Sequence, residues 1–181
     1  MIITISGVPG SGKSTVGRII AKKLGCKFFS IGDIRGEIAI CHGITIDELN
    51  KIGETEEWTD RETDEYQKDL GKKEKNLVVE GRLSFHFIPQ SFKIFLYVEP
   101  TEAARRALKS RRNRTDEKLP KTIEEVEKTL LRRLKSDKKR YQKYYGVDYT
   151  VSTNFDLFLN TTKMPILKVV AVILDKIKGL R

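Results

Sequence analysis

A glycine-rich run follows an apolar stretch at the start of the chain. Residues 2–5 have the pattern of a strand, and the run that follows, Gly7-Val8-Pro9-Gly10-Ser11-Gly12-Lys13-Ser14-Thr15, fits the phosphate-binding pattern G-x-x-x-x-G-K-[ST]. The glycines let successive N–H groups point at a polyphosphate. The helix expected over residues 13–24, ended by Gly25, directs its positive dipole end at the same anion.

The residue types in this run indicate what they would bind. Lys13 is expected to reach the β- and γ-phosphates of a nucleotide, and the Ser14 hydroxyl to bind Mg²⁺. A glycine-rich turn that binds nothing is the ordinary alternative, but the strand before it and the helix after it favour a site. All nine residues from Gly7 to Thr15 are therefore predicted to bind ATP, with Mg²⁺ as its companion ion.

Length and composition narrow the class of protein. The 181 residues, 39% of them hydrophobic and 33% charged, fit one α/β domain. A formal net charge of +10 suits a polyanionic partner, either nucleotides or nucleic acid. The two cysteines lack metal-site spacing and predict reduced thiols. No stretch is long enough to span a membrane, and the first residues leave no room for a signal peptide, so we expect a cytoplasmic enzyme.

Short apolar runs alternate with helical patterns along the chain. Strands are expected at residues 2–6, 27–30, 77–80, 93–98 and 156–160. Helices are expected at residues 13–24, 32–41, 46–52, 60–73, 101–111, 123–145 and 165–178. This alternation predicts a three-layer P-loop fold with a five-stranded parallel sheet between helices, in which ligands bind at the carboxyl ends of the strands.

Two connections are unusual for such a fold. Residues 32–75 join the second strand to the third and are mostly polar and helical in pattern, which predicts a helical insertion over the P-loop for a second substrate. Residues 111–120 contain no apolar run and either form a short lid over phosphates or an ordinary solvated turn. We treat residues 1–181 as a single domain that contains both segments.

Arginines are the second chemical signal, because transfer of a phosphoryl group needs positioning and charge neutralisation more than covalent help. Arg82 comes just after the third strand, at its carboxyl end, and Arg35 lies near the start of a helix after the second. Arg133, Asp137 and Arg140 share one face of the long helix, for which a solvent-exposed ion pair is the ordinary alternative. Two more arginines, Arg111 and Arg112, lie in the expected lid.

An acidic residue completes the predicted site. Glu80 ends the third strand beside the P-loop, where a carboxylate can hold a Mg²⁺-bound water. Asp33 is a weaker candidate for the same role.

Several segments together form a pattern that is more specific than the P-loop alone: the P-loop run, Phe29-Ser30-Ile31-Gly32-Asp33, Val79-Glu80-Gly81-Arg82-Leu83, Ser136-Asp137, Arg140-Tyr141, Tyr145-Gly146-Val147-Asp148, Asp156-Leu157 and Asn160-Thr161. In these segments the chain resembles the archaeal-type cytidylate kinases of the nucleoside monophosphate kinase superfamily. The matching segments cover nearly the whole chain in the right order. The resemblance implies transfer of the γ-phosphoryl group of ATP to CMP or dCMP, with residues 32–75 as the insertion that binds the acceptor.

The resemblance also implies roles for single residues. Arg82 and Arg133 would grip the acceptor phosphate, Ser30, Asp137 and Arg140 would hold the acceptor nucleotide, and Arg111 and Arg112 would be lid arginines. Many relatives carry an acceptor-binding arginine where this chain has Gly36, so Arg35 is the candidate replacement. Lys13, Arg82, Arg111 and Arg112 are the residues expected to act on the transferred group.

Two other functions remain open from the residues. One is an adenylate kinase or another small-acceptor kinase, and the other is a P-loop ATPase that assists RNA or ribosome assembly through its basic surface. For the kinase we expect ATP and a nucleoside monophosphate as partners, no requirement for nucleic acid, no membrane, and a monomer or small homo-oligomer.

Overall fold

A five-stranded parallel sheet forms the centre of the computed structural model, which describes residues 1–110 and 122–179. The strand order is β2-β3-β1-β4-β5, and all four pairings are parallel. The strands are β1 (Ile2–Gly7), β2 (Lys27–Ser30), β3 (Leu77–Glu80), β4 (Phe92–Tyr97) and β5 (Leu157–Asn160). Ile5 of β1 pairs in register with Glu80 of β3, which brings this carboxylate beside the strand that leads into the P-loop.

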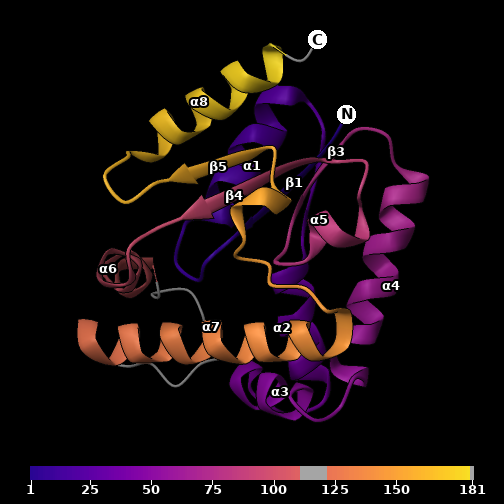
Figure 1. The fold of residues 1–181 in the computed structure, drawn as a ribbon, viewed down its shortest axis with the longest axis vertical. Coiled ribbons are helices and arrows are strands. Elements are labelled where there is room, and N and C mark those ends of the chain that lie inside the picture. The colour runs from indigo at the N-terminus through magenta and orange to yellow at the C-terminus, as the bar shows by residue number, and fades with distance from the viewer. Residues whose placement is uncertain (111–121, 180–181) are drawn as a thin grey trace.

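Helices cover both faces of the sheet (Figure 1). They are α1 (Lys13–Leu24), α2 (Ile31–Cys41), α3 (Ile46–Gly53), α4 (Trp58–Lys73), α5 (Ser84–Phe87), α6 (Pro100–Ser110), α7 (Ile123–Tyr145) and α8 (Ile166–Lys178), with a 3₁₀ turn at Ser152–Asn154. In Figure 1, α3 lies beside α7 at one end of the molecule, and α4 rises along its edge. The predicted three-layer α/β fold is confirmed.

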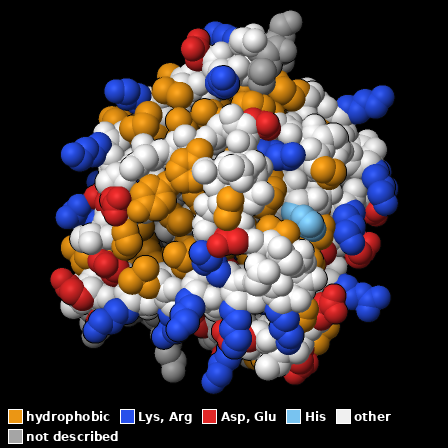
Figure 2. All heavy atoms as spheres, viewed as in Figure 1, with side chains coloured by type: hydrophobic (Ala, Val, Ile, Leu, Met, Phe, Trp, Pro, Cys, Tyr) orange, Lys and Arg blue, Asp and Glu red, His pale blue; other side chains and the backbone are white. Residues whose placement is uncertain are grey.

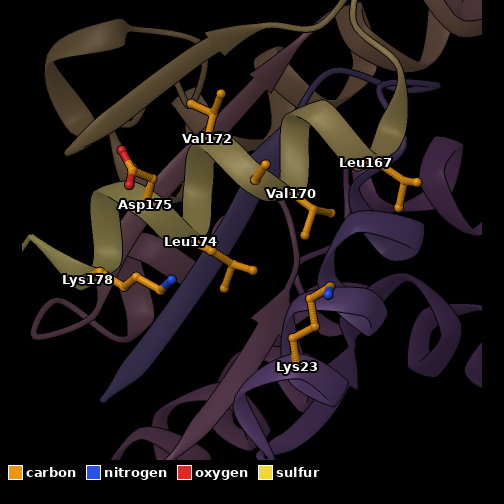
Figure 3. A pocket seen from close by; sticks show the side chains of 8 residues that line it. Lys23, Leu167, Val170, Val172, Leu174, Asp175 and Lys178 are labelled. Atoms are coloured by element: carbon orange, nitrogen blue, oxygen red, sulfur yellow. The ribbon is translucent and has the colours of Figure 1, made fainter.

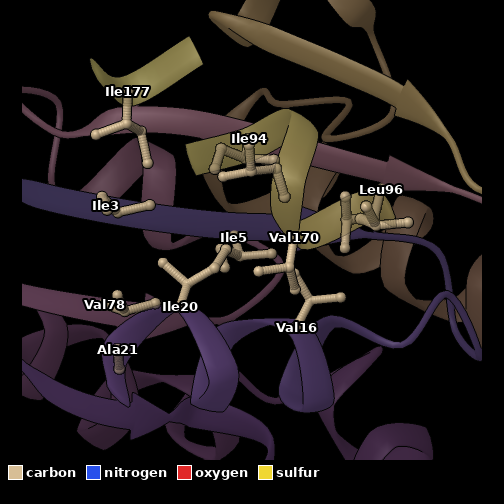
Figure 4. Packing of buried hydrophobic residues seen from close by; sticks show 12 residues of the cluster. Ile3, Ile5, Val16, Ile20, Ala21, Val78, Ile94, Leu96, Val170 and Ile177 are labelled. Carbon is tan, nitrogen blue, oxygen red and sulfur yellow. The ribbon is translucent and has the colours of Figure 1, made fainter. Parts of the chain in front are cut away.

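Alternation along β1 explains how the two layers attach to the sheet. Ile3 and Ile5 point to the face covered by α1 and α8, where they pack with Val16, Ile20 and Val170 (Figure 4). Thr4 and Ser6 are also fully buried, and the Ser6 hydroxyl donates to the carbonyl of Gly81 at 2.9 Å. The central strand therefore fixes both the apolar core and the backbone after β3.

Local sequence signals set the helix ends. Gly12 (φ +85°) precedes α1 and Gly25 (φ +63°) ends it, both in the left-handed region that favours glycine. Capping boxes start two other helices: Thr45 with Glu48 begins α3, and Thr122 with Glu125 begins α7.

The expected strands and helices are present, with ends that agree or differ by at most two residues. Helix α5 and the 3₁₀ turn were not expected, because four and three residues are too short to show a period. The predicted lid at residues 111–120, with Arg111 and Arg112, lies outside the described residues. Across residues 1–110 and 122–179, no helix is both long and apolar enough to cross a membrane.

Candidate active site

The loop between β1 and α1 has the shape that its glycines predict. Gly10 has φ +79°, and a Cβ atom there would lie 2.9 Å from the Ala103 carbonyl oxygen of α6. Lys13 is buried, and its Nζ donates to the Val8 carbonyl at 3.0 Å, across the base of the loop. A loop of this shape at a helix N-terminus, with a lysine inside it, can surround a polyphosphate.

Glu80 joins the P-loop to the second strand. Its Oε2 accepts hydrogen bonds from Ser14 Oγ at 3.1 Å and from Ser30 Oγ at 2.9 Å. Ser30 Oγ also accepts from the backbone N–H of Asp33 and so caps α2. One carboxylate oxygen thus connects the predicted ATP side to the predicted acceptor side.

The same residues fit a magnesium ion. A serine hydroxyl and a carboxylate that can hold a metal-bound water are oxygen ligands of the kind Mg²⁺ prefers. In the described part of the chain, no three His, Cys, Asp or Glu residues gather as a self-sufficient metal site, so an ion here would depend on nucleotide phosphates. Asp33, the weaker candidate, pairs with Arg18 at 2.8 Å, with both side chains about half exposed.

Asp137 brings two predicted arginines together. Its Oδ2 lies 2.6 Å from Arg82 Nε, and its Oδ1 accepts from Arg140 Nη2 at 3.1 Å. The Asp137 side chain is only 2% exposed, so the ordinary alternative of a solvated ion pair does not apply to this face of α7. Both carboxylate oxygens are engaged by arginines.

A second carboxylate, which sequence reasoning missed, holds the other side of this cluster. Asp60 of α4 lies with its Oδ2 2.8 Å from Arg140 Nε, and its Oδ1 accepts from Arg35 Nη1. Asn50 of α3 accepts from the same two arginines, at 3.1 Å from Arg35 Nη2 and 3.2 Å from Arg140 Nη1. Arg35 is therefore turned onto α3 and α4, and its role at the acceptor stays a prediction.

The charges of this cluster do not cancel. Three arginines, Arg35, Arg82 and Arg140, share two carboxylates, Asp60 and Asp137, which leaves one positive charge in excess among these five side chains. Burial alone would lower the pKa of Arg82, but attraction to Asp137 and nearby tyrosines outweighs it and raises that pKa above its usual value. The cluster stays cationic and can bind an anion.

Arg133 lies at the edge of this cluster. Its side chain is 12% exposed, and its Nε lies 3.0 Å from Asp47 Oδ1 of α3. The face of α7 that carries Arg133, Asp137 and Arg140 thus contacts α3, α4 and the segment after β3. Figure 2 shows Lys and Arg side chains along the edge of the molecule formed by α7 and α3.

A groove with a volume of about 700 Å³ lies elsewhere (Figure 3). It is lined by α8 and by Lys23 of α1, and no sequence-predicted site residue contributes to it. We therefore place the candidate site at the carboxyl ends of β1 and β3, where the P-loop, Glu80 and Arg82 meet.

Comparisons with known proteins show what the chain is similar to. The sequence profile of a cytidylate kinase-like family matches residues 2–163. A cytidylate kinase from Archaeoglobus fulgidus is 36% identical over 179 residues, which cover 98% of this chain and 95% of that protein. An S-adenosylmethionine-dependent nucleotide dehydratase from Lacinutrix mariniflava is 35% identical over 96% of this chain but only 35% of its own length. Among solved structures, a shikimate kinase from Acinetobacter baumannii has a TM-score of 0.61 at 23% identity, covering 99% of this chain and 94% of that one, which shows a shared fold.

Proposed function

Since the chain belongs to the cytidylate kinase-like family and is a nucleoside monophosphate kinase, we propose that its acceptor is CMP or dCMP. The reaction moves the γ-phosphoryl group of ATP to a phosphate oxygen of the acceptor and yields ADP with CDP or dCDP. The acceptor phosphate is already ionised at neutral pH, so the reaction requires no general base.

The P-loop binds the donor in this proposal. Residues Gly7 to Thr15 surround the triphosphate with backbone N–H groups, and Lys13 moves from the Val8 carbonyl to the transferred phosphoryl group. Ser14 and a water held by Glu80 are the protein's contribution to a Mg²⁺ site. The ion, when bound with ATP, neutralises charge on the phosphates.

The arginine cluster binds the acceptor. Arg82 and Arg133 contact its phosphate, while Ser30 and Arg140 hold the rest of the nucleotide. Asp137 keeps Arg82 and Arg140 in place, because a guanidinium that is already oriented loses less conformational entropy on binding. The excess positive charge of the cluster supports this assignment.

The strongest support is the position of Glu80, which contacts Ser14 on the donor side and Ser30 on the acceptor side, two residues before Arg82. Donor and acceptor phosphates would therefore meet at the end of β3. Residues 32–75 are the acceptor-binding insertion of a single domain in this proposal, and residues 111–120 its lid, with Arg111 and Arg112 on the phosphates. The enzyme is proposed to act in the cytoplasm as a monomer or small homo-oligomer.

A coupled assay of ADP formation tests the proposal with CMP, dCMP, UMP, AMP and GMP as acceptors. We expect kcat/KM to be highest with CMP or dCMP, and ATP consumption to depend strictly on the acceptor and on Mg²⁺. Highest activity with AMP would instead identify an adenylate kinase. ATP hydrolysis that RNA stimulates and salt suppresses steeply would indicate an assembly ATPase.

A further inference from the structure

The interior face of α4 is polar where an amphipathic helix is ordinarily apolar. Five of its residues are buried with relative exposures of 1–8%: Thr59, Asp60, Thr63, Asp64 and Gln67. Such burial is costly unless each polar group finds a partner. Asp60 meets the arginines, and Gln67 Oε1 accepts from the Ser84 hydroxyl of α5 at 2.7 Å.

Asp64 is the least satisfied of these groups. Its Oδ2 accepts a hydrogen bond from the Tyr145 hydroxyl of α7. Across residues 1–110 and 122–179 it forms no ion pair, and its Oδ1 accepts no hydrogen bond, in contrast to Asp60 and Asp137. A carboxyl that is 8% exposed and has one free oxygen is suited to a ligand that donates a hydrogen bond.

Asp64 and Tyr145 lie next to the arginine cluster, on two of the helices that contribute to it, α4 and α7. Asp64 is one turn along α4 from Asp60, and Tyr145 follows Asp137 by eight residues of α7, or about 12 Å of helix axis. Over that distance α7 carries three tyrosines, Tyr141, Tyr144 and Tyr145, of which Tyr145 donates a hydrogen bond to Asp64. The Tyr145 ring also contacts Phe87 and His86 of α5, with centroids 5.5 and 6.0 Å away.

This order of groups fits the two ends of a mononucleotide, with the phosphate at the arginines and the base at the tyrosines. Resting on the proposed function, we propose that Asp64, held by Tyr145, reads the acceptor base by accepting a hydrogen bond from the 4-amino group of cytosine. Uracil presents a carbonyl oxygen at that position, so the ionised Asp64 carboxylate and that oxygen would be two acceptors facing each other, and one would stay unpaired.

Asp137 is the competing reader of the base, since a carboxylate there could also accept from the amino group. Its two oxygens are already engaged by Arg82 and Arg140, whereas Asp64 has an oxygen to offer. The two assignments differ in which variant loses base selectivity.

The test measures kcat/KM for CMP, for UMP and for a CMP analogue with hydrogen in place of the 4-amino group. The variants are Asp64→Asn, Tyr145→Phe and, as a matched control on the exposed side of α4, Asp69→Asn. An asparagine can both donate and accept, so we expect the CMP-to-UMP ratio to fall at least tenfold in Asp64→Asn. The analogue has no hydrogen-bonding group at that position, so it should be a poorer substrate than CMP for both the wild type and this variant.

The other two variants separate positioning from folding. Tyr145→Phe keeps the ring but releases Asp64, so KM for CMP should rise severalfold with little change in kcat, and Asp69→Asn should match the wild type. If Asp64→Asn does not fold, the CMP-to-UMP ratio of kcat/KM in Tyr145→Phe decides the test. A wild type that prefers CMP, with a ratio unchanged within twofold in both variants, overturns the inference and leaves the proposed function intact. A wild type that phosphorylates no monophosphate overturns both.

Discussion

Asp60 and Arg140 form an ion pair inside the protein, with 2.8 Å between Oδ2 and Nε and side chains only 4% and 0% exposed. The pair joins α4 to α7 across 80 positions of sequence. Because Asp60 also binds Arg35, one carboxylate orients arginines from two helices. Breaking a buried pair leaves an uncompensated charge, which costs more than the pair itself contributes.

We therefore expect Asp60→Asn to lower the free energy of unfolding by about 3 kcal/mol, measured by urea denaturation. The control is Asp69→Asn on the same helix, whose partner Lys73 is largely exposed, and it should change stability by less than about 0.5 kcal/mol. A loss below about 1 kcal/mol in Asp60→Asn would show that Asn50 alone holds the arginines.

Lys13→Ala should abolish phosphoryl transfer without unfolding the protein. The ammonium group is lost from the P-loop, where it would meet the charge on the transferred group. The single-turnover rate and the melting temperature check the two parts separately. Retention of more than about a tenth of wild-type kcat/KM, a loss under roughly 1.4 kcal/mol, is incompatible with the proposed role.

Glu80→Gln should raise the Mg²⁺ concentration needed for half-maximal activity and lower kcat at least about tenfold. The amide keeps the shape of the side chain but removes the charge that holds a metal-bound water. Glu74→Gln, which loses only a surface contact with Lys27, is the control. An unchanged Mg²⁺ titration would assign Glu80 to structure alone.

Arg82→Ala should lower kcat/KM for CMP and for UMP by about the same factor, because a phosphate contact carries no information about the base. The ratio of kcat/KM for the two acceptors is the measurement, with ATP saturating. A selective loss for one base would place Arg82 beside the base instead of the phosphate.

The stability of the protein should fall between pH 5 and pH 8 because of Asp64. Burial, with a smaller effect of Asp60, raises the pKa of Asp64 to about 7 despite the Tyr145 hydrogen bond. An acid whose folded pKa is raised stabilises the fold below its unfolded pKa, near 4, and loses that contribution as pH rises through about 7.

Comparison with a variant isolates this group. Asp64→Asn cannot titrate there, so its unfolding free energy relative to the wild type should improve on the order of 1–3 kcal/mol from pH 5 to pH 8. Urea denaturation at both pH values measures the difference. Parallel pH profiles would mean that Asp64 is already ionised at pH 5.

Local signals made most of the fold predictable. The bounds of α1 agree at both ends because glycines in the left-handed region start and stop it. The strands β1, β3 and β4 are apolar runs in a parallel sheet. Strands of this kind are buried on both faces, so a continuous apolar run in the sequence predicts them. The P-loop and Arg82 were predictable as site residues because each comes directly after the carboxyl end of a strand.

The partners of the arginines could not be read in the same way. Along α4, polar residues at 60, 63, 64 and 67 have the spacing of a solvated helix face, and only the fold shows that this face is buried. Asn50 and Asp60 gain their meaning from Arg140, which is 80 or more positions away. The sequence offers one signal that this face is buried: the polar residues at helical spacing are followed on the same face by a leucine, Leu70.

The oxygen of Glu80 that accepts from both Ser14 and Ser30 has a thermodynamic consequence. A metal ion that draws the Ser14 hydroxyl away leaves that oxygen with Ser30 as its remaining hydroxyl partner, and an acceptor that engages Ser30 has the converse effect. The two substrates are then linked through a single atom. Linkage is reciprocal, so the factor by which bound ATP changes acceptor affinity equals the factor by which bound acceptor changes ATP affinity.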